Sequence, residues 1–322
     1  MSRETLGGIH HVTAIAADPQ RNLDFYAGTL GLRLVKLTVN FDDPGSYHLY
    51  YGDEIGRPGS LLTFFAWPGG QRGRQGNGQA AVVSFGIPPA SVGFWIERLL
   101  AQGIKYEGPV RKFDESVLML TDPDGLLLEL VATRRVTGAE SWADGPVPPE
   151  HAIRGLHGVT LWEDGDSGSA EFLASTMGFA PGPEEGGVLR LQSSNSGVGT
   201  VVNLRRAPGF WRGATGVGTV HHVAFRAATD QDQLNKRTEI EAQGLGITPV
   251  IDRQYFHSVY FREPGGVLFE IATDGPGFLI DEGRNDLGTQ LKLPPMYQST
   301  REDIERRLPP VRLPQLPVGR AR

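Results

Sequence analysis

The chain repeats two short phrases. Residues 7–15 read GGIHHVTAI and residues 218–225 read GTVHHVAF, while residues 122–134 read DPDGLLLELVATR and residues 263–275 read EPGGVLFEIATDG. A chain that contains one unit several times folds each copy in the same way, and the copies must then cover one another's apolar faces. The repeat therefore constrains the fold more than any other feature of this sequence.

Each copy of the unit has the pattern of one strand, one helix and three strands. In the first copy, Ile9–Ala16 is apolar and β-branched, which is typical of a strand. Asp18 and Pro19 then begin a helix that ends at Gly31, because Asp caps helices and Pro favours the first turn. We expect three strands at Leu32–Val39, Tyr47–Tyr51 and Ser60–Ala66, and further helices at residues 90–102, 169–177 and 231–243.

The sequence predicts an α+β protein of four βαβββ modules that form two open barrels. Residues 1–135 contain the first two modules, residues 136–152 are a linker rich in turn formers and prolines, and residues 153–275 contain the other two. Residues 276–322 lie outside the repeat and form a C-terminal arm. A second linker, PGGQRGRQGNGQ at residues 68–79, resembles a phosphate-binding loop in composition, but a strand follows it where such a loop needs a helix.

The arm has its own local signals. Ser299 and Glu302 give the pattern of a capping box for a short helix to about Leu308, and the Pro-rich end that follows is expected to be extended. The arm either closes over a pocket as a lid or lies on the surface as a strap, and the strap is the simpler interpretation.

Overlaying the four copies aligns two columns of residues. The opening strands place His11, Val82, Gly158 and His222 in one column, and the closing strands place Thr63, Glu129, Asn203 and Glu270 in the other. Because side chains alternate across a strand, a shared register means a shared face of the sheet. The two columns should therefore line equivalent cavities.

The pairing of modules decides which of these residues meet. If consecutive modules pair, His11 meets Glu129 and His222 meets Glu270. If the first module pairs with the fourth, one cavity receives His11, His222, Glu270 and Thr63, and the other receives Val82, Glu129, Gly158 and Asn203. We favour the second arrangement, because two imidazoles and one carboxylate form the facial triad that holds Fe(II) and leaves positions open. A carboxylate in place of Thr63 would instead complete a four-ligand Lewis-acid site.

Composition limits the kinds of partner. The chain has no cysteine, so any metal must be held by His, Asp or Glu. The formal net charge is -6 and no run of like charge occurs, so we expect neither a nucleic acid nor a membrane as partner. No apolar run approaches the roughly 20 residues that span a bilayer, and the N-terminal residues MSRETLGG lack the apolar core of a signal peptide. These features predict a cytoplasmic protein.

Several phrases carry a resemblance to a known family. The phrases are IHHVT, YHLYYGDEIGRPGS, GRQGNGQ, EHAIRGLHGVT, VHHVAF, SVYFREPGGVLFEIAT and LGTQLKLPP, and they extend over nearly the whole chain. In them the chain resembles the vicinal oxygen chelate (glyoxalase/extradiol dioxygenase) superfamily, and within it the hydroquinone-type ring-cleaving dioxygenases related to dichlorohydroquinone dioxygenase. The resemblance implies two glyoxalase-like barrels. We also expect a homo-oligomer. It also implies an enzyme that opens the ring of a small aromatic diol next to a hydroxyl and inserts both atoms of O2. The implied metal is Fe(II), with Mn(II) as the alternative.

The resemblance also assigns roles to residues. It places the metal on His11, His222 and Glu270, and it places the substrate contacts and catalytic groups on His10, Thr13, His221, Arg253 and Tyr260. Tyr260 would donate to a substrate oxygen and Arg253 would steady developing negative charge. On regular strands, however, His10 and His221 would point away from the ligand face. A packing role and a substrate contact both stay open for them, because a twisted strand end could bring either residue near the substrate.

Other candidates have weaker support. His48 and His257 are secondary candidates for acid–base chemistry, whereas Glu129 and His157 are expected to be structural. Three rival functions also stay open: a glyoxalase-type metalloisomerase or lyase, a catechol-type extradiol dioxygenase, and a non-catalytic binding module on the same scaffold. Thr63 argues against the first, and a binding module would not need the triad.

Overall fold

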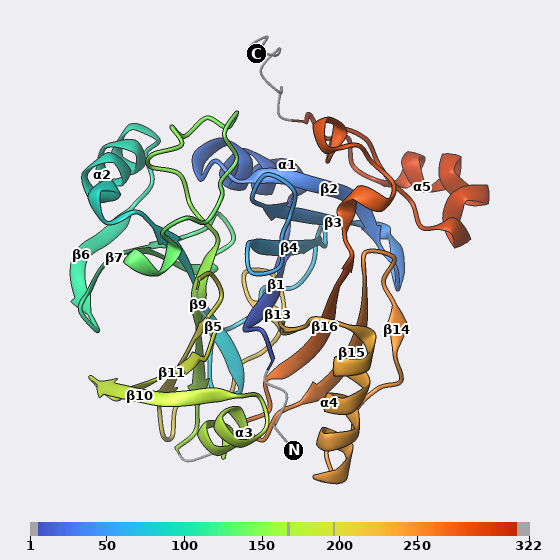
Figure 1. The fold of residues 1–322 in the computed structure, drawn as a ribbon. Coiled ribbons are helices and arrows are strands. Elements are labelled where there is room, and N and C mark those ends of the chain that lie inside the picture. Colours follow the sequence, from blue (N-terminus) through green and yellow to red (C-terminus); the bar gives the residue numbers. More distant parts are fainter. Residues whose placement is uncertain (1–5, 166–167, 196, 314–322) are drawn as a thin grey trace.

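The computed structural model describes residues 6–165, 168–195 and 197–313. Residues 1–5 and the last part of the Pro-rich end, for which the sequence predicts extended chain, lie outside the described residues. Within the described part of the chain, no helix is both long and apolar enough to cross a membrane. The predicted repeat is present as four modules of one strand, one helix and three strands (Figure 1).

The modules have the following elements. The first contains β1 (Ile9–Ala16), α1 (Pro19–Leu23) with a π-helical turn (Asp24–Thr29), β2 (Arg33–Asn40), β3 (Asp43–Gly52) and β4 (Leu61–Ala66). The second contains β5 (Gln79–Ile87), α2 (Val92–Ala101), β6 (Tyr106–Lys112), β7 (Glu115–Thr121) and β8 (Leu127–Ala132). The third contains β9 (Leu156–Glu163), α3 (Ser169–Ser175), β10 (Phe179–Glu185), β11 (Val188–Ser193) and β12 (Val201–Arg206). The fourth contains β13 (Val220–Ala227), α4 (Asp230–Ala242), β14 (Ile251–Asp252), β15 (Phe256–Arg262) and β16 (Leu268–Pro276).

The strands form two eight-stranded sheets. The order β14-β15-β16-β13-β1-β4-β3-β2 combines the first and fourth modules, and the order β10-β11-β12-β9-β5-β8-β7-β6 combines the second and third. In the middle of each sheet the opening strands of two modules lie antiparallel, β1 with β13 and β5 with β9. The predicted pairing of modules 1 and 4 is confirmed, and the alternative in which His11 meets Glu129, with module 1 paired to module 2, is wrong.

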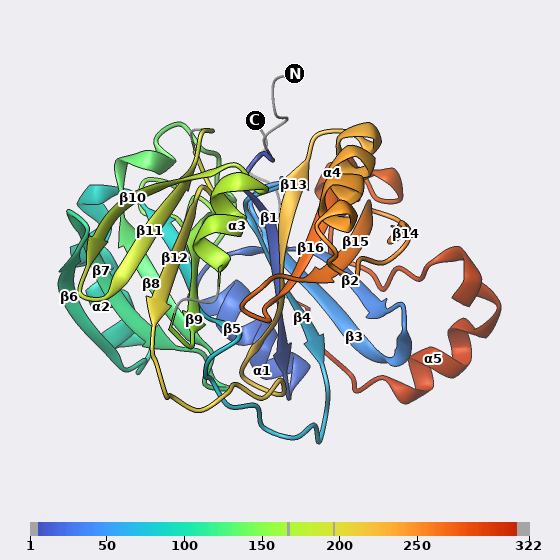
Figure 2. The ribbon, with the colours of Figure 1, turned by 90° about the horizontal axis from the view of Figure 1, so that it is seen from below.

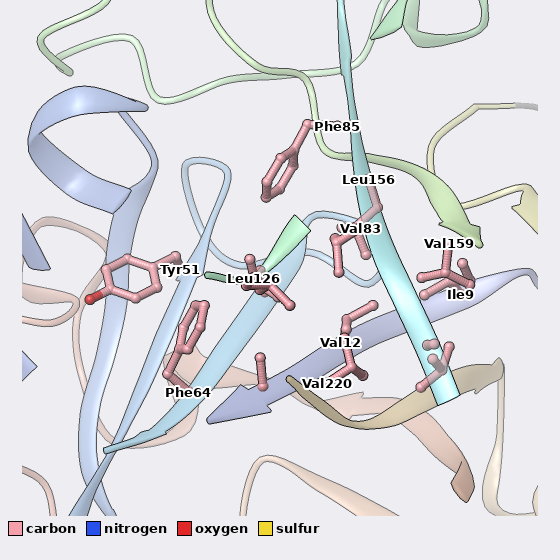
Figure 3. Packing of buried hydrophobic residues seen from close by; sticks show 14 of the residues in the cluster. Ile9, Val12, Tyr51, Phe64, Val83, Phe85, Leu126, Leu156, Val159 and Val220 are labelled. Carbon is pink, nitrogen blue, oxygen red and sulfur yellow. The ribbon is translucent and has the colours of Figure 1, made fainter. Parts of the chain in front are cut away.

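The two sheets pack back to back. Val12 of β1 and Val220 of β13 face Val83 of β5 and Val159 of β9, and all of them lie in one hydrophobic core (Figures 2 and 3). Burying each such side chain contributes about 1.5–3 kcal/mol to the free energy of unfolding. Because side chains alternate along a strand, the residues that come directly before and after these valines in the sequence point to the other face of each sheet, away from the core. The repeat therefore creates two open faces, one on each sheet.

The pairing of β1 with β13 contains two β-bulges. Ile9 pairs with Phe225 and His11 with the next residue, Ala224, so His10 is an extra residue on β1. Thr13 pairs with His222 and Ala14 with Val220, so the extra residue on β13 is His221. A bulge turns its side chain away from the regular alternation of the strand. The condition of regular strands, on which the opposite-face expectation for His10 and His221 rests, is therefore not met at either residue.

The C-terminal arm lies along β2 and β3. The backbone N–H of Lys292 donates to the carbonyl of Leu37 at 2.9 Å, and the hydroxyl of Tyr297 donates to the carbonyl of Phe41 at 2.8 Å. The arm contains the helix α5 (Arg301–Arg307), whose N-cap residue is Thr300 with no side-chain cap bond. The predicted capping box was wrong, because a 3-10 turn over residues 295–300 leads into the helix and includes Ser299.

The buried amine of Lys36 anchors the arm to the first sheet. Its side chain is fully buried, and its Nζ forms ion pairs with Asp281, at 2.5 Å, and with Glu282. A buried cation needs such partners, since an unpaired charge in the interior is strongly destabilising. The arm is thereby attached to β2 by charge as well as by backbone hydrogen bonds.

Gly158 shows how closely two strands of the second sheet approach. It lies on β9 opposite Val201 of β12, and a Cβ atom at position 158 would lie 2.2 Å from the carbonyl oxygen of Val201. Real contacts of this kind are never so short, so the backbone would have to move. No side chain fits at this position of the second sheet.

We predict that Gly158→Ala destabilises the protein. The added methyl group overpacks the junction of β9 and β12, which should lower the free energy of unfolding by about 1–3 kcal/mol in urea denaturation. The matched control is Gly93→Ala in α2, where a Cβ has nothing within 4 Å and removes a helix-destabilising glycine. Equal stability of the two variants would contradict this description of Gly158.

Candidate metal centre

Three side chains from three strands converge on the open face of the first sheet. The Nε2 atom of His11, on β1, lies 3.3 Å from Nε2 of His222, on β13, and 3.4 Å from Oε2 of Glu270, on β16. The Nε2 atom of His222 lies 2.9 Å from the same carboxylate oxygen. Metal bonds of about 2.1 Å at right angles place ligand atoms about 3 Å apart. The three atoms thus have the spacing of one face of an octahedral site.

Glu270 fits the role of a metal ligand better than that of a core residue. Its side chain is fully buried, and among the described residues its Oε2 atom has the two histidine Nε2 atoms as neighbours but no hydrogen-bond donor. The other oxygen, Oε1, accepts a hydrogen bond of 2.5 Å from the hydroxyl of Ser258 on the neighbouring strand β15. Burial alone would raise the pKa of Glu270, but His11 and His222 hold the pKa well below its ordinary value. The buried carboxylate is therefore ionised and leaves one oxygen free for a cation.

The two bulge residues orient the two candidate ligand rings. Nδ1 of His10 lies 2.9 Å from Nδ1 of His11, and Nδ1 of His221 lies 2.8 Å from Nδ1 of His222. When the ligand ring carries the proton of this hydrogen bond, its Nε2 presents a lone pair to the metal. Burial lowers the pKa of His10, and it lowers the pKa of His221 to about 3. Both rings are therefore neutral and can accept this hydrogen bond from the ligand ring. The bulges thus supply the support that a metal-bound histidine needs.

Thr63 is the fourth residue that the two aligned columns bring to this face of the sheet, and it contributes a hydroxyl. Oγ1 of Thr63 lies 2.9 Å from Oγ1 of Thr13 and 2.9 Å from Nε2 of His48, whose Nδ1 is bonded to the hydroxyl of Tyr50 at 2.9 Å. Thr63 is thereby held in a hydrogen-bonded chain and adds no carboxylate. Among the described residues, the group able to hold an ion consists of His11, His222 and Glu270.

A cavity of about 360 Å³ opens above these three residues. Its apolar walls come from Phe41, Phe65, Trp67, Phe256 and Leu268. Its polar lining includes Thr13, His48, His221, Arg253 and Tyr260, so four of the five predicted contact residues line the cavity and His10 lies behind it. None of the described arm residues lines the cavity, which agrees with a strap rather than a lid.

Tyr260 and Arg253 form one unit at the side of the cavity. Tyr260 lies directly across from Glu270 in the pairing of β15 with β16. The Nε atom of Arg253 donates to the hydroxyl of Tyr260 at 3.3 Å, and its other nitrogens contact Asp42 at 3.1 and 3.2 Å. Burial raises the pKa of Tyr260, so its hydroxyl is protonated at neutral pH and can act as a donor.

A family model decides the assignment of this architecture. The Glyoxalase/Bleomycin resistance protein/Dioxygenase superfamily matches residues 8–130 and 147–271. The chain belongs to this superfamily. The resemblance to the vicinal oxygen chelate proteins is confirmed, and the superfamily places the three converging side chains in a metal-dependent scaffold.

Relatives within the superfamily cover nearly the whole chain. It is 46% identical over 316 residues to "Putative ring-cleaving dioxygenase MhqO" of Bacillus subtilis (strain 168), which covers 98% of this chain and 100% of the relative. It is 33% identical over 313 residues to "Chlorohydroquinone/hydroquinone 1,2-dioxygenase" of Sphingobium indicum, with 94% and 96% covered. A solved "putative dioxygenase from Bacillus subtilis subsp. subtilis str. 168" superposes with a TM-score of 0.93 at 45% identity, covering 97% of this chain and 100% of the other.

Among the described residues, the second sheet has no equivalent group of three possible metal ligands. Its corresponding column holds Val82 and Gly158 in place of the two histidines, and no side chain fits at Gly158. Glu129 accepts hydrogen bonds from Ser84 at 2.7 Å and from Lys112 at 2.7 Å. These contacts agree with the structural role expected for Glu129.

The remaining histidine candidates lie elsewhere. His257 contacts Asp230 at 2.6 Å and is not in the cavity, whereas His157 is buried beside Glu115 at 3.1 Å on the second sheet. The sequence did not single out Ser258 or Asp42. The signal for Ser258 was available, since it is two residues before Tyr260 and so shares its face of β15.

We predict that Ser258→Ala weakens metal binding. The hydroxyl orients Glu270, and removing such outer contacts typically costs about 10–100-fold in metal affinity. Chelator competition with Fe(II) on the intact protein measures this affinity. The matched control is Ser84→Ala, which removes the equivalent hydroxyl from Glu129 on the second sheet and should leave the affinity unchanged. If both variants bind the metal as tightly as the parent, the hydroxyl of Ser258 has no such role.

Proposed function

We propose that the protein is an Fe(II)-dependent dioxygenase that opens the ring of a hydroquinone next to one hydroxyl. The observation that carries the proposal is the three-ligand face at the floor of an aromatic cavity, with a protonated tyrosine and an arginine beside it. The identity to a chlorohydroquinone/hydroquinone 1,2-dioxygenase over nearly the whole chain supports the substrate class.

The residues that would hold the metal are His11, His222 and Glu270, and Mn(II) is the alternative ion. When bound, Fe(II) with three open positions supplies a place for one diol oxygen and for O2 and lets electrons pass between them. In the overall reaction the bond between the hydroxyl-bearing carbon and its neighbour breaks. One oxygen atom completes a carboxyl group at the first carbon, and the other becomes the carbonyl oxygen of the second.

Tyr260 and Arg253 are the groups that handle charge and protons. The hydroxyl of Tyr260 is protonated at neutral pH, so it can donate to a substrate oxygen and supply the proton that oxygen–oxygen cleavage requires. Arg253 keeps that hydroxyl in place and places a positive charge beside it, while Asp42 fixes the guanidinium from the other side. This arrangement stabilises negative charge that develops on the substrate oxygen.

The cavity walls suit a single ring with apolar substituents. Phe41, Phe65 and Phe256 surround the site with flat apolar faces that exclude water from the reacting atoms. Neutral His48 and His221 complete the polar side without adding a charge, because burial lowers the pKa of both. Thr13, bonded to Thr63, lies on the cavity side of β1 between them.

The rival functions differ in what they require of this cavity. A glyoxalase-type metalloisomerase needs a further acidic ligand, and Thr63 occupies that position with its hydroxyl already bonded. A catechol-type enzyme would use the same three ligands, so only the substrate separates it from our proposal. Homo-oligomeric assembly and a cytoplasmic location stay predictions.

Oxygen uptake tests the proposal. The Fe(II)-loaded protein should consume O2 with hydroquinone, methylhydroquinone and chlorohydroquinone, and at least about tenfold more slowly with catechol, since the proposed substrate class has its second hydroxyl across the ring and catechol has it on the neighbouring carbon. An oxygen electrode with product analysis measures this. Faster uptake with catechol would identify the catechol-type enzyme, and isomerisation of a thiol adduct without uptake would identify the metalloisomerase. His11→Ala is the inactive reference, and His257→Ala, outside the cavity, should behave like the parent.

We predict that Tyr260→Phe lowers kcat without loss of iron. The ring that packs beside His222 is kept and only the donor hydroxyl is lost, which should reduce kcat about 100–1000-fold. The rate with saturating hydroquinone and the iron content by atomic absorption are the two measurements. Tyr106→Phe on β6 of the second sheet is the matched control. A Tyr260→Phe variant with full kcat would remove Tyr260 from the mechanism.

A further inference from the structure

The turn between β2 and β3 closes the metal cavity on the side away from the three ligand candidates. These candidates lie on β16, β13 and β1, which are middle strands of the first sheet, whereas β14 and β2 are its two ends. The sheet curls until its ends meet, because Asp42, just after β2, contacts Arg253, just after β14, at 3.1 and 3.2 Å. In a curled sheet the meeting point of the two ends lies across from the middle strands. The cavity therefore has the three ligand candidates at its floor and a polar rim opposite them.

Contacts on two sides hold this turn in place. Phe41 and Asp42 make up the whole connection between β2 and β3. On the cavity side, both carboxylate oxygens of Asp42 accept from the guanidinium of Arg253. On the outer side, the hydroxyl of Tyr297 on the C-terminal arm donates to the carbonyl of Phe41 at 2.8 Å. The polar groups of the rim are thus preorganised, which lowers the cost of binding a ligand there.

Asn40, the last residue of β2, presents a donor at this rim. It lines the cavity, and 8% of its surface is exposed. Its Oδ1 accepts from the backbone N–H of Asp42 at 3.0 Å, and this contact fixes which end of the amide is the oxygen. Its Nδ2 donates to no residue in the described part of the chain and keeps accessible surface. The amide therefore has N–H donors that a ligand in the cavity can use.

Asp42 places an acceptor beside that donor. It also lines the cavity, and Arg253 occupies one of the two lone pairs on each carboxylate oxygen. A neutral hydroxyl accepts one hydrogen bond and donates another, so it needs such a donor and acceptor side by side. His48 cannot offer this pair, because its two ring nitrogens are already bonded to Thr63 and Tyr50. The rim is therefore suited to a neutral hydroxyl.

We propose that Asn40 binds the second hydroxyl of the substrate, the one that is not on the metal. This inference rests on the function proposed above and names the group that selects the diol. In hydroquinone the two hydroxyls lie at opposite ends of the ring, so a molecule with one at the floor directs the other across the cavity to the rim. There the amide N–H of Asn40 donates to this hydroxyl, and the hydroxyl donates to Asp42.

The same arrangement disfavours catechol. Both of its hydroxyls lie at one end of the ring, so a catechol bound at the floor leaves Asn40 and Asp42 without a partner. A site that is built to bond a substrate hydroxyl rejects a molecule that lacks it, because polar groups of the site are then left unpaired. Asn40 is thus a specificity-determining residue, whereas the three ligand candidates are common to both reactions.

Binding without oxygen tests the role of Asn40. Hydroquinone and phenol differ by this one hydroxyl, and under nitrogen neither is consumed. In titration calorimetry the Fe(II)-loaded full-length protein should bind hydroquinone more tightly than phenol. Asn40→Ala should weaken hydroquinone binding about 3–10-fold, the usual effect of losing one hydrogen bond, and should leave the affinity for phenol unchanged. Asn235→Ala, on an exposed residue of α4 outside the cavity, should match the parent with both ligands.

Asn40→Ser is the second variant, in case the alanine variant loosens the turn. The serine hydroxyl can still accept from the N–H of Asp42, but the shorter side chain withdraws the donor from the cavity. It should lose affinity for hydroquinone alone. Equal losses for hydroquinone and phenol in Asn40→Ser, or no loss for either, would overturn the inference.

Oxygen uptake by the parent protein separates this inference from the proposed function. A parent that consumes no O2 with any diol, but binds hydroquinone through Asn40 under nitrogen, would remove the dioxygenase and keep the binding site. A parent that consumes O2 with hydroquinone, but whose Asn40 variants bind hydroquinone and phenol as the parent does, would keep the dioxygenase and remove Asn40 from substrate selection.

Discussion

The structure depends on the antiparallel pairing of β1 with β13. These strands belong to the first and last modules, and their pairing places His11 beside His222 although 211 positions separate them in the chain. The two bulges in this ladder matter as much as the pairing itself. Each bulge inserts one histidine behind another, so that an outer ring can hold the Nδ1 of the inner ring. Parallel pairing of β13 with β16 then adds the carboxylate of Glu270.

The two sheets show how one repeated backbone can present different side chains at equivalent positions. The backbone places equivalent side chains on equivalent faces, so a histidine on β1 corresponds to Val82 on β5, and one on β13 corresponds to Gly158 on β9. Close contact with Val201 keeps any side chain from position 158, whereas the first sheet has room for an imidazole at the matching place. Glu129 has the same side chain as Glu270 at the matching position, but its carboxylate forms an ion pair with Lys112. The difference between the sheets therefore lies in side chains and in one tight crossing of strands.

The sequence predicted the fold class, the pairing of modules and the convergence of the three ligand candidates, because a period of two along each strand carries the register from one repeat to the next. It did not predict where that period is broken. The bulges at His10 and His221 depend on how two distant strands meet, which no local pattern records. Asp42 was missed for a related reason: it lies between β2 and β3, and its contact with Arg253 joins residues 211 positions apart. The capping box at Ser299 failed because the preceding turn, and not the capping pattern, determines where α5 begins.

The position of the ligand candidates at opposite ends of the chain has a consequence for assembly. An ion held by residues 11, 222 and 270 closes a loop of more than 200 residues, and closing a long loop removes more conformational freedom from the unfolded chain than closing a short one. During synthesis, β1 also cannot pair with β13 until the fourth module has been made. Such an ion could therefore bind only after the fourth module has been made, and it would then hold the first and fourth modules together.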